Sequence, residues 1–369
     1  MRQTSSAGPL AWLYAALIVY ASLYPFSGWG GGHGSPLDFV LEPSQRGITR
    51  FDLWSNFIAY LPFGGLVFAG AVRSLGQRTL PAALLASLTG AALSFAMEAL
   101  QHYVPTRVPS AVDLATNSAG ATMGAALGAL VHASGGLGRW QVLRERWFIP
   151  RSGGGIVLLV MWPLALLFPT PMPLGLGQLL GELQSLLVDA LDGSPAQDWA
   201  REWLERSRAY GSLARASELA AVACGLLAPC AVAFSIAVSP WRRLALLAGA
   251  GLLGIAATTL STALNFSPQH GLAWLTPTAV GGLIAGACLA ASMAWLPRRI
   301  CAGLGLIAIC ALVAIVFQAP ADPYYALSLQ RWEQGRFIHF HGAARWVGWL
   351  WPYAAMIFLL GRVGARDDR

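Results

Sequence analysis

Acidic and amide side chains recur at helical spacing between residues 52 and 117, and they are the side chains in this chain best suited to chemistry. Residues three or four positions apart share one face of a helix. Three such faces are polar: Asp52 with Asn56, Ser94 with Glu98 and Gln101, and Asp113 with Asn117. Carboxylates and amides gathered around an arginine could hold a divalent metal and a phosphate, relay a proton, or brace helices against one another.

Glu98 and Arg107 can be interpreted in two ways. A carboxylate about one turn inside an apolar segment, as Glu98 is, costs a few kcal/mol unless it is paired, protonated or hydrated. Arg107 is the nearest cation that could offset this cost, so the two residues form either a buried brace or part of a functional pocket. We favour the pocket, because two further acids and three amides accompany the pair. The candidate ligand-binding cluster comprises Asp52, Asn56, Glu98, Gln101, His102, Arg107, Asp113 and Asn117, and no metal is assigned to it.

The composition predicts that a lipid bilayer surrounds most of the chain. Of the 369 residues, 56% are hydrophobic and only 11% are charged, less than half of the charged share that is usual in a soluble domain. Apolar stretches of about 20 residues, long enough to cross a hydrocarbon core of about 30 Å, recur with short polar breaks. We therefore expect an all-α, polytopic transmembrane helix bundle.

Ten apolar segments are predicted to be transmembrane helices. They cover approximately residues 9–26, 53–73, 79–102, 111–133, 154–170, 213–238, 242–263, 271–295, 299–318 and 343–361. With a cytoplasmic N-terminus, most arginines but few acids lie on the cytoplasmic side, as the positive-inside rule prefers. Both termini are therefore expected in the cytoplasm. The net charge of +7 follows this topology and offers no patch for nucleic acid.

An Arg- and Gly-rich segment, residues 136–153, is expected to be a cytoplasmic linker between two units. Residues 1–135 form a four-helix unit that carries the polar cluster, and residues 154–369 form a six-helix unit. The long outer loop of the second unit, residues 171–212, carries leucines at helical spacing and Trp199 four positions before Trp203. We expect two amphipathic helices at the membrane interface there. A short soluble cap over the bundle is the alternative.

The order and spacing of the polar residues resemble the VanZ-like family over about residues 38–133. The resemblance rests on the stretch from Asp52 to Gly64, on Glu98-Ala-Leu-Gln101, and on Arg107 through Gly120 with Gly124 after it. Many members of that family carry an acid three residues after the arginine, where this chain has Ser110. The resemblance implies a multi-pass protein of the bacterial inner membrane, in a family associated with resistance to the glycopeptide antibiotic teicoplanin.

The residues leave three functions open. No nucleophile with an adjacent base, Gly-rich phosphate loop or HExxH motif is present in the sequence. We therefore expect no cofactor, and we favour a non-enzymatic envelope protein that binds an amphiphilic or lipid-linked ligand, such as a lipid-linked glycan or phosphate, among membrane lipids. An intramembrane hydrolase or transferase acting on a polyprenyl phosphate or another lipid-linked substrate is one alternative. A transporter is the other, and the lack of a detectable inverted repeat disfavours it. No oligomeric state is predicted.

Overall fold

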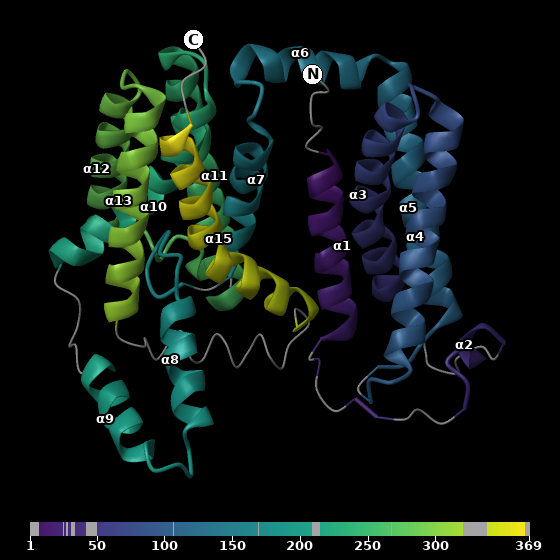
Figure 1. The fold of residues 1–369 in the computed structure, drawn as a ribbon, viewed down its shortest axis with the longest axis horizontal. Coiled ribbons are helices and arrows are strands. Elements are labelled where there is room, and N and C mark those ends of the chain that lie inside the picture. The colour runs from purple at the N-terminus through teal and green to yellow at the C-terminus, as the bar shows by residue number, and fades with distance from the viewer. Residues whose placement is uncertain are drawn as a thin grey trace. The chain divides into compact units, whose positions relative to one another are not determined.

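The computed structural model describes residues 7–24, 26, 29–30, 34–41, 50–105, 107–168, 170–208, 215–266, 268–319 and 338–365. Over these residues the chain is helical, and the predicted all-α fold is confirmed. The same residues form no strand, and their one isolated bridge joins Phe148 to Ala237. The chain divides into two compact units, Met1–Arg146 and Trp147–Arg369 (Figure 1).

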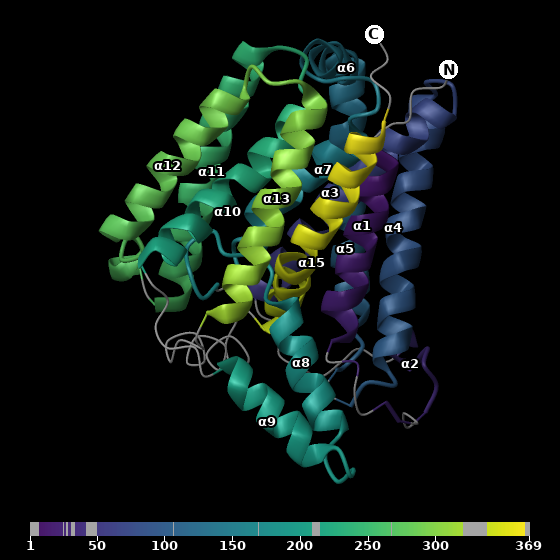
Figure 2. The ribbon, with the colours of Figure 1, turned by 60° about the vertical axis from the view of Figure 1, so that its left-hand side comes forward.

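The first unit is built around four helices that run antiparallel to their neighbours along the chain (Figures 1 and 2). Its helices are α1 (Ala7–Leu23), α2 (Asp38–Leu41), α3 (Arg50–Ser74), α4 (Thr79–Gln101), α5 (Ala111–Ala133) and α6 (Gly136–Trp147). Helix α3 packs against α5, α4 and α1. Helix α6 lies within the segment that the sequence predicted to be a linker.

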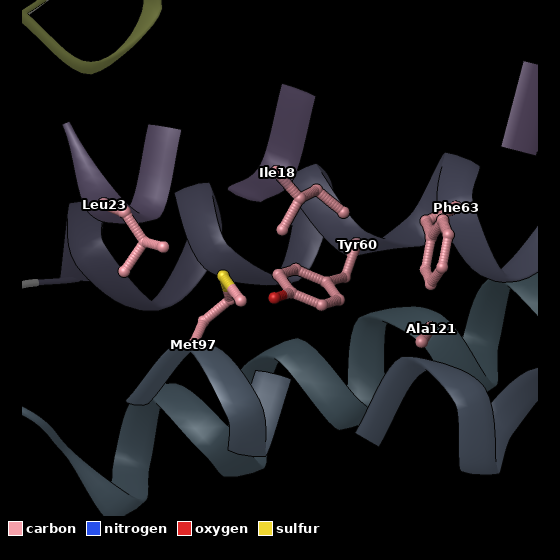
Figure 3. Packing of buried hydrophobic residues seen from close by; sticks show 6 residues of the cluster. All are labelled: Ile18, Leu23, Tyr60, Phe63, Met97 and Ala121. Atoms are coloured by element: carbon pink, nitrogen blue, oxygen red, sulfur yellow. The ribbon is translucent and has the colours of Figure 1, made fainter. Parts of the chain in front are cut away.

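The four long helices of the first unit meet in one apolar core (Figure 3). Its buried residues are Ile18 and Leu23 of α1, Tyr60 and Phe63 of α3, Met97 of α4 and Ala121 of α5. Lipid chains are as apolar as these side chains, so close van der Waals packing, and not the hydrophobic effect, must hold such helices together in a membrane. The fit between the helices is therefore decisive for stability.

Glycines set the closest approach in the first unit, between α3 and α5. A Cβ at Gly64 would overlap the backbone of Ala121, and one at Gly120 would overlap the carbonyl oxygen of Phe57. A Cβ at Gly124 would overlap the carbonyl oxygen of Leu61. Backbones approach this closely only where side chains are absent. The small-residue ladder on α5 is thus a packing device.

The second unit is arranged around one buried helix. Its elements are α7 (Gly153–Ala165), α8 (Leu179–Ala190), α9 (Gln197–Arg208), α10 (Arg215–Ile236), α11 (Pro240–Phe266), the 3-10 turn η1 (Pro268–His270), α12 (Pro277–Met293), α13 (Arg298–Gln318) and α15 (Ile338–Gly364). Helix α10 packs against α7, α11, α12, α13 and α15, and almost every residue from Ala221 to Ile236 is buried. Gly282 and Gly286 bring α12 against the α10 backbone.

One of the arginines that were predicted to set the topology, Arg243, also caps a helix. Arg243 is 5% exposed, and its Nη1 donates to the carbonyl oxygens of Ala294 and Leu296, at 2.9 and 2.6 Å. These carbonyls follow the last residue of α12. A cation at a helix C-terminus satisfies carbonyls that have no partner within the helix and complements the helix dipole.

Six helices are long and apolar enough to cross a membrane, judged by length and composition. They cover Asp52–Ser74, Thr79–Gln101, Arg215–Ile236, Pro240–Leu264, Arg298–Gln318 and Arg345–Gly364. All ten predicted segments contain a helix, but the predicted count of about ten transmembrane helices is not confirmed. Helices α1 and α12 have 17 residues each and α7 has 13. Helix α5 has 23 residues, but Asp113 and Asn117 lower its hydropathy.

Two helices form within the predicted outer loop 171–212, whose residues 209–212 lie outside the described ranges. Helices α8 and α9 pack against each other, and Arg201 of α9 pairs with Asp192 at 2.7 Å. Trp199 and Trp203 stack with their ring centroids 6.2 Å apart. Their four-residue spacing therefore predicted a shared face correctly, while their place relative to a membrane stays a prediction.

Candidate functional site

The predicted polar residues lie at the end of the first bundle where α4 ends and α5 begins. Glu98 is 3% exposed, and its Oε2 accepts a hydrogen bond of 2.9 Å from the backbone N–H of Ser110. The Ser110 hydroxyl in turn accepts from the N–H groups of Val112 and Asp113, at 3.2 and 3.4 Å. Ser110 is therefore the N-cap of α5. Glu98 fixes the start of α5 through that cap.

A buried polar layer lies below the cap. Asn117 donates from Nδ2 to the hydroxyl of Ser94 at 3.0 Å, and the two residues are 6% and 0% exposed. Tyr60 is 4% exposed, points its hydroxyl toward α4 (Figure 3), and interacts with Ser94 and Glu98. Among the described residues, neither the Tyr60 hydroxyl nor Asn117 Oδ1 completes a hydrogen bond. Polar side chains of α3, α4 and α5 therefore meet in this layer.

An acidic rim lies above this layer, formed by Asp52, Asn56 and Asp113. Asp52 is exposed, while Asn56 and Asp113 are half-buried. The Asn56 amide interacts with the Asp113 carboxylate, and Asp52 lies within electrostatic range of it. Two carboxylates beside an amide attract cations and hydroxyl or amino groups. Within the part of the chain that is described, no three His, Cys, Asp or Glu side chains come together as metal ligands.

Gln101 and Arg107 turn toward α1. The Arg107 Nη2 donates to the carbonyl oxygens of Ala21 and Tyr24, at 2.9 and 3.2 Å, and Gln101 donates to that of Ser22 at 3.1 Å. Burial lowers the pKa of the Arg107 guanidinium while nearby Glu98 opposes that shift, and an arginine remains charged in either case. Arg107 is thus a C-terminal cap for α1 within the electrostatic range of Glu98.

Two further ring-bearing residues belong to the description of the site: His102, which was predicted for the cluster, and Tyr60, which was not. The ring of His102 packs edge-on against Tyr103, with centroids 5.1 Å apart, and its place in the ligand-binding cluster stays a prediction. Tyr60 was not predicted, although it follows Asn56 by four residues and so continues the face that Asp52 begins. An extension of that face by one more turn would have found it.

Comparison with known families identifies this region. Residues 11–132 match the family model described as VanZ/LLP1. The match includes α3, α4 and α5 with all eight predicted residues, and it confirms the resemblance for the N-terminal part of the chain. No curated protein and no solved structure matches the chain. The match and the apolar helices together make this a membrane protein with a VanZ-like N-terminal region.

Proposed function

We propose that the VanZ-like unit is a binding module of the bacterial cell envelope. In this proposal an amphiphilic or lipid-linked envelope molecule lies beside α3 and α5 and places its polar headgroup on Asp52, Asn56 and Asp113. The observation that carries the proposal is the acidic rim above a buried polar layer. Three separate helices contribute side chains to that one end of the bundle.

The surface beside the rim supports an amphiphilic ligand. Val112 of α5 directly precedes Asp113 and is 36% exposed, and Val108, just before α5, is 47% exposed. A headgroup on the rim therefore leaves its apolar chains near exposed, branched aliphatic side chains at the start of α5. Such a surface favours a molecule that already resides in the membrane over a freely soluble one.

The charge of the rim restricts the headgroup. Two neighbouring carboxylates, Asp52 and Asp113, repel a bare phosphate, and Arg107 already donates to the carbonyls of α1. A lipid-linked phosphate therefore requires a divalent cation between its oxygens and the rim. A hydroxyl-rich glycan headgroup could accept and donate hydrogen bonds there without a cation.

The expected result with a polyprenyl phosphate follows from this charge. For the purified full-length protein in a maltoside detergent, the ligand should raise the melting temperature in Mg²⁺ and have little effect in a chelator. Asp52→Asn and Asp113→Asn keep the side-chain shape and remove the charge. Each should weaken binding by about tenfold, equivalent to ~1.4 kcal/mol.

Glu218→Gln in α10 of the second unit is the matched control, because it makes the same chemical change on a half-buried acid outside the cluster. It should leave the ligand-induced shift unchanged. The double variant Asp52→Asn/Asp113→Asn tests the rim as a whole. If it keeps the full ligand-induced shift in melting temperature, the rim does not bind the ligand. A ligand with a neutral glycan headgroup, tested without Mg²⁺, separates the two headgroup classes.

The rim is proposed to face the outside of the inner membrane. Arg73 lies in the last turn of α3 and Arg78 precedes α4, both at the opposite end of the bundle, and Arg144 and Arg146 lie on α6 beyond α5. The positive-inside rule assigns that end to the cytoplasm. Both chain termini are proposed to be cytoplasmic as well.

Alkaline phosphatase fusions test this orientation. A fusion after Pro195, between α8 and α9, is expected to be active because the enzyme would reach the periplasm. A fusion after Arg146, in α6, is expected to be inactive. The opposite pattern would invert the topology and place the rim in the cytoplasm.

A further inference from the structure

An irregular segment between α7 and α8 is buried inside the second unit. Leu174 and Leu176 are each 1% exposed, and Met172 packs with residues of α10 and α13. Leu174 has a φ of 60°, a left-handed conformation that is strained for leucine. Irregular backbone in an apolar unit persists only where surrounding protein holds it, and strained residues cluster at functional sites. The segment ends at Gln178, which is the N-cap residue of α8.

Gln178 begins α8 with unused hydrogen-bonding capacity. Its side chain does not cap the helix, and its amide nitrogen and oxygen are both buried without a hydrogen-bond partner in the described structure. A buried polar group without a hydrogen-bond partner destabilises a fold. A helix N-terminus also carries a partial positive charge and N–H groups that favour anions.

One face of α15 lies against this helix start. Arg345, Trp349 and Tyr353 share it because they are four residues apart. The Nη2 of Arg345 lies 3.4 Å from Oε2 of Glu182 in the first turn of α8, and its Cζ lies 4.0 Å from the centroid of the Trp349 ring. The Tyr353 hydroxyl lies near the N–H of Leu180 without completing a hydrogen bond.

Donor groups predominate on this face. Trp349 is only 4% exposed, and its indole N–H has no hydrogen-bond partner among the described residues. The same holds for the Nε of Arg345 and for the Tyr353 hydroxyl. Buried indole N–H and phenol groups usually find a partner. Several unused donors and a guanidinium beside a helix N-terminus suit an oxyanion, which accepts hydrogen bonds and carries negative charge.

We propose that Gln178, Arg345, Trp349 and Tyr353 bind a phosphate-type oxyanion at the N-terminus of α8, in competition with the carboxylate of Glu182. The site belongs to the second unit and does not rest on the function proposed for the VanZ-like unit. Helix α8 also exposes Leu183, Leu186 and Leu187. This apolar surface favours a lipid phosphate over free phosphate as the source of the oxyanion.

Thermal unfolding of the full-length protein in a maltoside detergent tests the site with three probes. Short-chain phosphatidylglycerol is expected to raise the melting temperature, and a diacylglycerol with the same chains is not. Inorganic phosphate alone separates the sources: a rise with it identifies a free anion, and no rise identifies the lipid. If neither phosphate-bearing probe raises the melting temperature, the proposal is wrong.

Variants that remove single donors locate the effect. Trp349→Phe and Tyr353→Phe keep an aromatic ring and remove an unpaired N–H or O–H, so the unliganded protein should be equally stable or more stable. Each should weaken phosphatidylglycerol binding by about tenfold. Glu182→Gln should strengthen binding, because it removes the competing charge. Weaker phosphatidylglycerol binding by Glu182→Gln would show that this carboxylate supports binding and does not compete with an oxyanion, and it would overturn the proposal.

Trp351→Phe is the matched control for Trp349→Phe. The Trp351 indole N–H already donates to the carbonyl oxygen of Leu158 at 2.8 Å, so its loss should lower the melting temperature without ligand. The shift caused by phosphatidylglycerol should remain. If Trp349→Phe and Tyr353→Phe likewise keep the full shift, these donors do not hold the oxyanion and the assignment fails.

Discussion

Gly124→Ala is expected to destabilise the protein by about 3 kcal/mol or to prevent it from folding. Insertion of a methyl group into a packed interface usually costs about 1–3 kcal/mol because side chains can adjust. At Gly124 the new Cβ would meet the carbonyl of Leu61 and lie 3.0 Å from the backbone nitrogen of Gly65. Backbone atoms cannot rotate away, so α3 and α5 would have to separate. Thermal unfolding in detergent measures the loss.

Gly70→Ala supplies the control for this prediction. Gly70 lies on α3, one of the two helices in the contact, but its nearest potential neighbour is the backbone nitrogen of Gly8 at 3.9 Å. Alanine fits there and is favoured over glycine in a helix by about 1 kcal/mol. Gly70→Ala should therefore be neutral or stabilising. Equal melting temperatures for the two variants would show that α3 and α5 are not in close backbone contact.

Arg107→Ala is expected to destabilise the VanZ-like unit by about 3 kcal/mol. The substitution removes two charge-assisted hydrogen bonds to the end of α1 and leaves the Glu98 carboxylate without its nearby cation. Arg107→Lys should recover only part of the loss, because an ammonium does not reproduce the planar geometry of the guanidinium. Unfolding of the purified variants in detergent gives the order of stability.

A double variant separates the two roles of Arg107. If Arg107 acts mainly by balancing Glu98, then Glu98→Gln in the Arg107→Ala background should restore most of the stability. The hydrogen bonds to α1 lead us to expect only partial recovery. Arg78→Ala, at an exposed arginine before α4 with no side-chain cap, should change stability by less than about 0.5 kcal/mol. If Arg107→Ala lowered the stability as little as Arg78→Ala, the capping role of Arg107 would be contradicted.

The sequence predicted the presence of the helices better than the positions of their ends. Apolar stretches between arginines and prolines placed a helix in each predicted segment, because a span is a local property of composition. The segment predicted as 154–170 fails at its end: α7 stops at Ala165, and Leu166 and Phe168 are buried in irregular chain. Hydropathy cannot distinguish a buried irregular stretch from a helix, because both are apolar.

The sequence likewise predicted some features of the candidate site and not others. Spacing predicted which residues share a face, and the order of Asp52, Glu98 and Asp113 along the chain placed them at one end of the bundle. Spacing could not show that Arg107 donates to the carbonyls of α1, because any helix C-terminus offers the same acceptors. It also could not separate the buried Glu98 from the exposed Asp52. That difference depends on packing between helices that are distant in sequence.

The burial of α10 has a consequence for biogenesis. Of the helices that cover it, only α7 is made before it, while α11, α12, α13 and α15 are synthesised afterwards. A nascent chain that ends before Arg298 therefore holds a finished α10 whose contact surfaces for α13 and α15 face lipid or a chaperone. The second unit can therefore complete the packing around α10 only after α15 has been synthesised.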